Sequence, residues 1–216
     1  MGRQVRPDDS AEQSHVRLHV ATSRSEPLEQ LLARRRCVRE YADRPVTLAN
    51  AACLLWAAQG ISAADSLRTS PSAGALYPMD IYLAAGAVTE LVPGIYRYLP
   101  KENAIEGAAE GDQRAALAAA ALGQTWLADA ALILIITAHY ERTTWKYGRR
   151  GIQYVHMEAG HAAQNVLLMA VTLNLGAAVV GAFDDGRVAS VTGLSGKETP
   201  LYLVPVGYPA YPAHPG

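Results

Sequence analysis

The most continuous apolar pattern in the sequence lies between Ile152 and Leu175, where alanine and leucine dominate and proline is absent. Gly176 follows the last apolar residue, as a helix stop does, so this stretch predicts one long helix. Nearly every side of that helix is apolar, which is typical of a helix buried on most of its faces. We expect it to be the central helix of the core.

A few polar residues interrupt this helix at a regular spacing. At about 100° per residue they fall within a sector of roughly 60°, and together they form a polar seam: Tyr154, Glu158, His161, Asn165 and Thr172. Because buried polar groups need partners, this seam must meet another polar element, a second subunit or a ligand.

The remaining patterns predict shorter elements. Helices are expected at 28–36, 48–59, 112–122 and 187–194, and strands at 79–88, 94–99, 131–140, 177–183 and 201–207. This order predicts an α+β fold with helices flanking a mixed sheet. We expect residues 1–26 to be a flexible arm, 27–209 one folded domain and 210–216 a proline-rich tail.

Composition excludes several classes of protein. The chain has 216 residues, 50% of them hydrophobic and 18% charged, with a formal net charge of -1. These values suit one compact domain and provide no global field to attract nucleic acid. The longest strongly apolar run, 130–138, is too short to cross a bilayer. Cys37 and Cys53 lack metal-type spacing and the N-terminus lacks a signal-peptide pattern, so we expect a reducing cytoplasm.

Two stretches are candidate ligand sites. Arg34, Arg35, Arg36 and Arg39 form the densest cationic cluster, and arginine forks match the oxygens of a phosphate. The alternative is a solvated basic helix end. The loop 70–74 is rich in serine and glycine, so it is either a backbone cradle for a planar ligand or only a turn.

Glu158 and His161 form an E-x-x-H pair, a spacing that binds metal in di-metal helical bundles. Only one copy of the pair exists, so we expect no metal centre and favour a hydrogen-bonded core histidine. A di-metal protein remains the third hypothesis for function.

Several motifs, taken in order, are more specific than any one alone. They read RRRCVREY (34–41), LLWAAQGI (54–61), PSAGALYPMDIYL (71–83), GIYRY (94–98), YGRRGIQYVHMEAGHAAQN (147–165), LNLGAAVVGAFDD (173–185) and LYLVPVGYP (201–209). This series resembles the nitroreductase superfamily. The pieces PSAGALYP, EAGHAAQN and GAF resemble its SagB-type, or thiazole-oxidase-like, dehydrogenase branch.

The resemblance implies a homodimeric, nitroreductase-like α+β fold with FMN at the subunit interface, each site using both chains. It implies that the first motif holds the FMN phosphate and ribityl chain through Arg35, Arg36 and Arg39. Cys37 stands where a serine is common. Many relatives also place a late Lys or Arg on the phosphate, whereas here only His214 follows Lys197 among basic residues.

The resemblance also assigns the flavin ring. The loop that flanks the ring matches Pro71, Ser72, Ala73 and Gly74, contributed by the partner subunit. Gly181 and Ala182 match the segment that directs backbone N–H groups toward the ring edge.

Lys146 and Tyr147 match an adjacent Lys-Tyr pair that, in azoline-oxidising relatives, assists proton removal from a thiazoline or oxazoline ring. Such aromatisation needs a base, and a desolvated lysine or a tyrosinate can serve. The alternative is an exposed loop lysine beside a lid aromatic.

The leading hypothesis is therefore an FMN-dependent oxidoreductase that transfers hydride by a ping-pong mechanism. Its substrates would be NAD(P)H with nitroaromatics or quinones, or an azoline in a modified peptide. The alternative is a non-catalytic flavin or small-ligand binding protein.

Overall fold

The computed structural model describes residues 15–20 and 26–211. Its middle layer is a seven-stranded sheet in the order β1-β4-β3-β2-β5-β7-β6, and all neighbouring strands run antiparallel. The strands are β1 (His15–Arg17), β2 (Met79–Ala85), β3 (Gly94–Leu99), β4 (Ala104–Glu110), β5 (Leu132–Ala138), β6 (Gly176–Ala177) and β7 (Thr199–Gly207). In the described residues, parallel pairing occurs only at two isolated bridges, Cys37 with Ala177 and Val46 with Val88.

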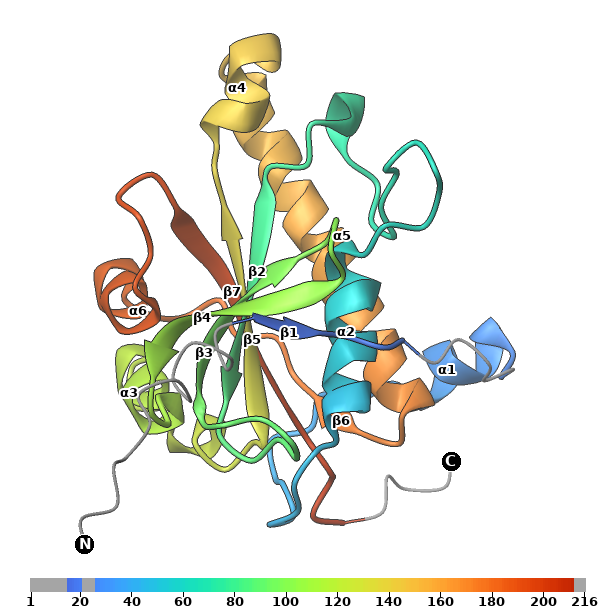
Figure 1. Ribbon diagram of the computed structural model, residues 1–216, viewed down its shortest axis with the longest axis vertical. Coiled ribbons are helices and arrows are strands. Elements are labelled where there is room, and N and C mark those ends of the chain that lie inside the picture. Colours follow the sequence, from blue (N-terminus) through green and yellow to red (C-terminus); the bar gives the residue numbers. More distant parts are fainter. Residues whose placement is uncertain (1–14, 21–25, 212–216) are drawn as a thin grey trace, which may run out of the picture.

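Helices cover both faces of this sheet (Figure 1). The first face carries α2 (Leu48–Gln59) and the long α5 (Arg150–Thr172), and the second carries α3 (Arg114–Ala120) and α6 (Asp185–Thr192). Two short helices, α1 (Leu28–Arg34) and α4 (Glu141–Tyr147), project outward, and α4 follows the end of β5. Single 3₁₀ turns, η1 (Ala73–Ala75) and η2 (Thr125–Leu127), lie in loops. The α+β class and the long central helix are confirmed, whereas the sheet expected to be mixed is antiparallel between all its strands.

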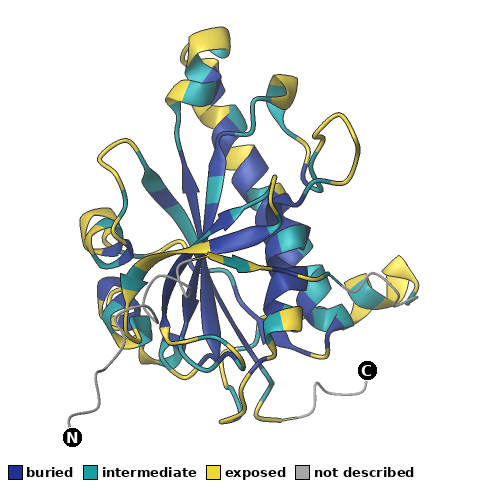
Figure 2. Cartoon of the chain, viewed as in Figure 1, coloured by how far each residue is buried: buried dark blue, intermediate teal, exposed yellow. Residues whose placement is uncertain are grey.

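Strand β5 is the centre of the core, and all seven of its residues are buried (Figure 2). Alternate residues such as Leu134 pack toward α2 and α5, while Ile133 and Ile135 pack toward α3 and α6. Burying each large aliphatic side chain contributes roughly 1.5–3 kcal/mol. Because both faces of β5 are dry, polar chemistry is confined to the ends and edges of the sheet.

Two element boundaries differ from the sequence prediction. The helix expected over 28–36 ends at Arg34, because Cys37 pairs with Ala177 and needs extended backbone. The strand expected over 177–183 contains only Gly176–Ala177 and an isolated bridge at Val180. Gly181 and Ala182 therefore lie in an exposed loop instead of a strand.

Three elements were not predicted: β1, β4 and α4. Strand β4 reads AIEGAAE, in which Ile105 is the single β-branched residue among alanines, a glycine and glutamates, so the residue types that mark a strand are scarce. Strand β1 pairs with β4, so this part of the expected flexible arm is instead the edge of the sheet. The rest of the arm (1–14 and 21–25) and most of the tail (212–216) lie outside the described residues. None of the described helices combines the length and hydropathy that a membrane crossing needs.

The polar seam of α5 finds much of its partner within the same chain, in the loop before β2. The buried Glu158 accepts a 2.7 Å hydrogen bond from the Ala73 N–H, and the Ser72 hydroxyl also hydrogen-bonds to this carboxylate. Two helical turns after Glu158, the Asn165 amide donates to the Ala57 and Thr69 carbonyls and to Ser70 Oγ. The loop is thus attached to α5 at two points.

The same loop satisfies the C-terminal end of α2, where helix carbonyls lack intrahelical partners. Thr69 Oγ1 donates to the Trp56 carbonyl and Ser70 Oγ donates to the Ala58 carbonyl. Arg68 donates to the buried Gln59 side chain. With α2 and α5 both bonded to it, the loop has a fixed position relative to the core.

Replacing Glu158 with glutamine tests this attachment through its pH dependence. Burial raises the pKa of Glu158, although hydrogen bonds from Ala73 and Ser72 and the nearby His161 act to lower it. The folded chain therefore holds this proton more tightly than the unfolded chain. We expect the stability of the native protein to fall relative to Glu158→Gln as pH rises from about 4.5 through the raised pKa of Glu158.

Urea unfolding of both proteins between pH 4 and pH 8 measures this difference. Glu102→Gln, in an exposed turn, is the control for loss of one negative charge. A native protein that instead gains stability over Glu158→Gln with rising pH would show that the folded state prefers the carboxylate.

Candidate functional site

The loop Pro71–Gly74 forms one wall of a hollow of about 290 Å³. Pro71, Ser72 and Ala73 line it from the loop. Three seam residues and the neighbouring Met157 line it from α5: Tyr154, Glu158, His161 and Met157. His161 is exposed here, whereas Glu158 is buried by its bonds to the loop. The predicted loop residues and the first half of the seam therefore share one site.

Lys146 and Tyr147 converge on Gly74 from α4. A Cβ added at Gly74 would lie 2.7 Å from Tyr147 Oη and 2.9 Å from Lys146 Nζ, and Gly74 has a φ of +63°. The positive φ favours glycine at this position, and the two short distances show how closely the ends of both side chains approach it. The Tyr147 ring also packs edge-on against Tyr154, with 5.3 Å between centroids. The structure thus brings the predicted catalytic pair to the predicted ring-binding loop.

The arginine cluster lies elsewhere, next to the end of α5. The extended segment 35–39 runs beside β6, and Cys37 pairs with Ala177. Arg35 Nη1 lies 3.9 Å from Cys37 Sγ, and the Arg39 guanidinium lies 5.7 Å from the centroid of the Trp126 ring. Arg36 bends back to the carbonyls of Ala33 and Arg35, at 2.7 and 2.8 Å.

Gly181 and Ala182 belong to the arginine side of the molecule. Gln124 beside η2 donates to the Ala182 carbonyl at 3.1 Å, and the Arg39 guanidinium lies over the Trp126 ring of η2. Both Gly181 and Ala182 are exposed, so the backbone of this segment is open to a ligand.

These two groups of residues lie far apart within one chain. The loop is bonded at Glu158, whereas the arginine segment pairs with Ala177, just beyond the end of α5. At about 1.5 Å per residue, Glu158 and Thr172 alone are roughly 21 Å apart along the helix. A single chain therefore does not bring the loop and the arginines to one small ligand.

Sequence reasoning missed a cavity of about 420 Å³ on the far side of the arginine segment. Arg36 and Val38 line it from this segment and Arg44 from the residues that follow, opposite apolar residues of α5. The Arg44 guanidinium lies 3.7 Å from the centroid of the Tyr208 ring. Side chains alternate between two sides of an extended segment, so Arg36 projects away from Arg35 and Cys37. This alternation was the only sequence signal for a ligand cavity on the other side of the segment.

Sequence reasoning also missed a charged cluster around Asp80, on the α3–α6 face of the sheet. The Asp80 carboxylate contacts Arg97 at 3.0 Å, His139 at 3.1 Å and Arg142 at 3.1 Å. Burial alone would raise the pKa of Asp80, but Arg142, Arg97 and His139 outweigh it and hold that pKa below its ordinary value. An aspartate inside the otherwise apolar strand MDIYLAA was the available signal.

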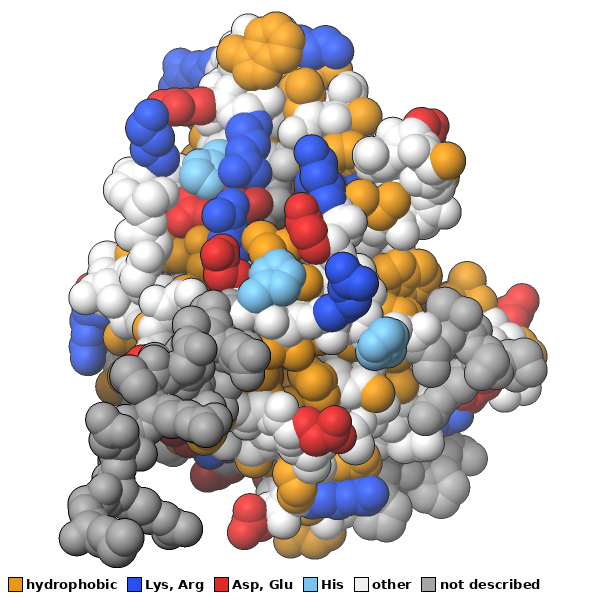
Figure 3. All heavy atoms as spheres, viewed as in Figure 1, with side chains coloured by type: hydrophobic (Ala, Val, Ile, Leu, Met, Phe, Trp, Pro, Cys, Tyr) orange, Lys and Arg blue, Asp and Glu red, His pale blue; other side chains and the backbone are white. Residues whose placement is uncertain are grey.

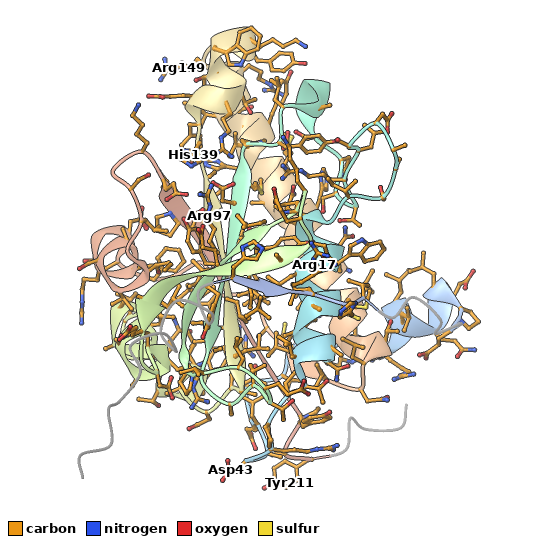
Figure 4. The ribbon with its side chains drawn as sticks, viewed as in Figure 1. Arg17, Asp43, Arg97, His139, Arg149 and Tyr211 are labelled. Carbon is orange, nitrogen blue, oxygen red and sulfur yellow. The ribbon has the colours of Figure 1, made fainter. Side chains whose placement is uncertain are left out.

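Glu198 extends this cluster. His139 Nε2 lies 3.1 Å from Glu198 Oε1, and the Tyr82 hydroxyl donates to the same carboxylate. Burial and the Glu198 carboxylate raise the pKa of Tyr82. Figure 4 shows Arg97 and His139 on the same side of the molecule, and Figure 3 shows a histidine among acidic and basic side chains there.

In the described chain, Asp80, His139 and Glu198 form the one group of three side chains with metal-ligand spacing. Arg97 and Arg142 already neutralise the Asp80 carboxylate. His139 Nε2 already hydrogen-bonds to Asp80 and to Glu198. A divalent cation would add charge beside two guanidinium groups, so the cluster fits an ion-pair network instead. Glu158 and His161 belong to no such group in the described chain.

Comparison with known proteins identifies the family. The sequence pattern of the nitroreductase family matches residues 32–208. A Methanocaldococcus jannaschii protein described as a nitroreductase is 47% identical over 180 residues, covering 83% of this chain and 90% of that protein. The crystal structure of a Ralstonia eutropha protein described as a nitroreductase superposes with a TM-score of 0.81 at 27% identity, covering 98% of this chain and 97% of the other.

A further relative carries a different description. The microcin B17-processing protein McbC of Escherichia coli is 28% identical over 142 residues, which is 63% of this chain and 52% of McbC. This chain thus spans about half of McbC but most of the archaeal relative. Because the family pattern covers most of its length, the chain belongs to the nitroreductase family and is an oxidoreductase of that family.

Proposed function

We propose that this protein is an FMN-dependent oxidoreductase that acts as a homodimer, with each flavin held by the arginine segment of one chain and the loop of its partner. The separation of these two groups along α5 supports the proposal, because a partner chain is needed to complete the site. The exposed leucines of α1 and the exposed Met157 of α5 are suited to such a contact.

The side chains fit an anionic, planar cofactor. Arg35 and Arg39 offer guanidinium groups to the phosphate, and the exposed backbone at Gly181 and Ala182 offers N–H groups to the ring. Arg36 already donates to two backbone carbonyls, so we assign it a smaller part in binding the phosphate. Cys37 is exposed beside Arg35 and supplies at most a weak donor. The phosphate therefore relies on Arg35 and Arg39.

Among possible substrates we favour an azoline in a modified peptide. The observation that carries this choice is the convergence of Lys146 Nζ and Tyr147 Oη on Gly74 of the loop. FMN, when bound, takes up a hydride from one substrate and delivers it to a second, which is a ping-pong sequence. Oxidation of an azoline also releases a proton from the ring, and Lys146 or Tyr147 would accept it.

An NAD(P)H-linked nitroreductase activity is the second candidate, favoured by the archaeal relative at 47% identity. Such an enzyme would take hydride from the nicotinamide and pass electrons to nitroaromatics or quinones. The alternative class is a non-catalytic flavin or small-ligand binding protein. It predicts tight binding without turnover on either substrate pair.

We place the protein in the cytoplasm.

The cofactor assignment predicts the visible spectrum. Purified protein should show FMN at one per chain, identified after denaturation. Arg35→Ala with Arg39→Ala should weaken FMN binding by about 100-fold or more, because two charge-assisted hydrogen bonds of about 1.5–3 kcal/mol each are lost. Arg34→Ala is the matched control, because Arg34 pairs with Glu26. A colourless protein that also fails to take up added FMN would overturn the assignment.

The base assignment predicts a selective loss of azoline oxidation. Lys146→Met with Tyr147→Phe should lower kcat for a thiazoline peptide by about 100-fold or more, the usual contribution of a general base. FMN content and hydride uptake from NAD(P)H should remain. Lys101→Met, in an exposed turn, is the control. Unchanged azoline turnover in the double variant would exclude the pair as the base.

A further inference from the structure

The Asp80 carboxylate connects the two segments that meet at Gly74, which are helix α4 and the loop that leads into β2. Arg142 of α4 binds it with both arms of its guanidinium, Nη1 to Oδ1 and Nη2 to Oδ2, each at 3.1 Å. The Asp80 side chain is only 13% exposed and that of Arg142 is 36% exposed, so the carboxylate end of the pair is shielded from water. Bidentate pairing also fixes the orientation of the arginine, which a single contact would not do.

Asp80 belongs to the same segment as the loop. It lies two residues after Pro78, where the loop enters β2, and the His139 N–H donates to the Pro78 carbonyl at 2.9 Å. Thr137 Oγ1 donates to the Asp80 carbonyl. Any element bonded to the Asp80 side chain is therefore positioned relative to the loop, and hence to Gly74.

Helix α4 needs such an anchor because it contributes little to the core. It has seven residues, of which only Thr143 is buried, and it ends at Gly148 with φ 54° and ψ −144°. A helix of two turns is marginal without tertiary contacts. The Tyr140 hydroxyl bonds His156 at 2.6 Å, which ties the start of α4 to α5. Arg142 provides the corresponding tie to the β2 side.

Lys146 and Tyr147 lie in the next turn of α4 after Arg142. Residues four apart share a helix face, so the contact that fixes Arg142 also fixes where Lys146 projects. We propose that Asp80 and Arg142 are positioning residues that hold Lys146 and Tyr147 at Gly74. This inference rests on the proposed function for its kinetic consequence, but its structural consequence stands independently.

Arg97 supplies a matched control. It contacts the same Asp80 oxygen at 3.0 Å, but from β3, away from α4. Its side chain is 40% exposed, close to the 36% of Arg142. Arg97→Gln and Arg142→Gln therefore remove the same charge and one partner of the same carboxylate, and differ in whether α4 is released.

The first test observes Tyr147 directly, in holoenzyme labelled with 3-fluorotyrosine. Its ¹⁹F resonance is assigned by its loss in Tyr147→Phe. We expect Arg142→Gln and Asp80→Asn to shift or broaden this resonance while that of Tyr208, beyond the opposite end of β7 and against Arg44, is unchanged. Arg97→Gln should leave both unchanged, and Arg142→Lys should restore part of the native position, since lysine keeps the charge without the fork. An unchanged Tyr147 resonance in Arg142→Gln would overturn the inference.

The second test is kinetic. Arg142→Gln should lower kcat for a thiazoline peptide by about 10- to 100-fold, the scale of an ångström-sized misplacement of a reacting group. KM and FMN content should stay near their native values, and Arg97→Gln should retain native kcat. If Lys146→Met and Tyr147→Phe are themselves without effect, the proposed base is wrong, and the ¹⁹F result alone decides the positioning role. If they abolish turnover while Arg142→Gln keeps it, the positioning role is wrong.

Discussion

The hydrogen bond from the Ala73 N–H to the buried Glu158 carboxylate is the contact on which the rest of the site depends. A carboxylate inside an apolar helix is costly unless donors surround it, so the loop and the helix require each other. Asn165 repeats the arrangement two turns later, where its amide bonds the same loop. Because α2 ends on this loop as well, Gly74 is presented by the rigid core and not by a free turn.

The length of α5 keeps the two groups of candidate ligand-binding residues apart within one chain. One end carries the loop with Lys146 and Tyr147, and the other end carries the arginines and the exposed backbone at Gly181. We therefore propose that two chains share each cofactor. The Asp80 network lies on the α3–α6 face of the sheet and contacts α4 through Arg142.

The sequence predicted the elements whose side chains repeat with a clear period. The apolar cylinder of α5, the isoleucine run of β5 and the strands β2 and β3 all follow from such patterns, and the structure confirms them. Strand β4, with its alanines and glycine, has no such pattern and is held by its neighbours β1 and β3. The seam of α5 correctly indicated that Glu158 and Asn165 need partners, but not that a loop about 90 residues earlier supplies them. The pairing of Asp80 with Arg142 depends on tertiary distance, which no local pattern encodes.

Mixing two defective chains tests the shared site most directly. An Arg35→Ala, Arg39→Ala chain lacks one half of the proposed site, and a Gly74→Trp chain has its loop blocked by a bulky ring. Each alone should bind little FMN. After co-refolding, about a quarter of all sites should combine two intact halves in a two-fold dimer, and FMN binding should recover to that level. No recovery in a mixture that does form heterodimers would contradict the account, because it would mean that each chain builds its flavin site alone.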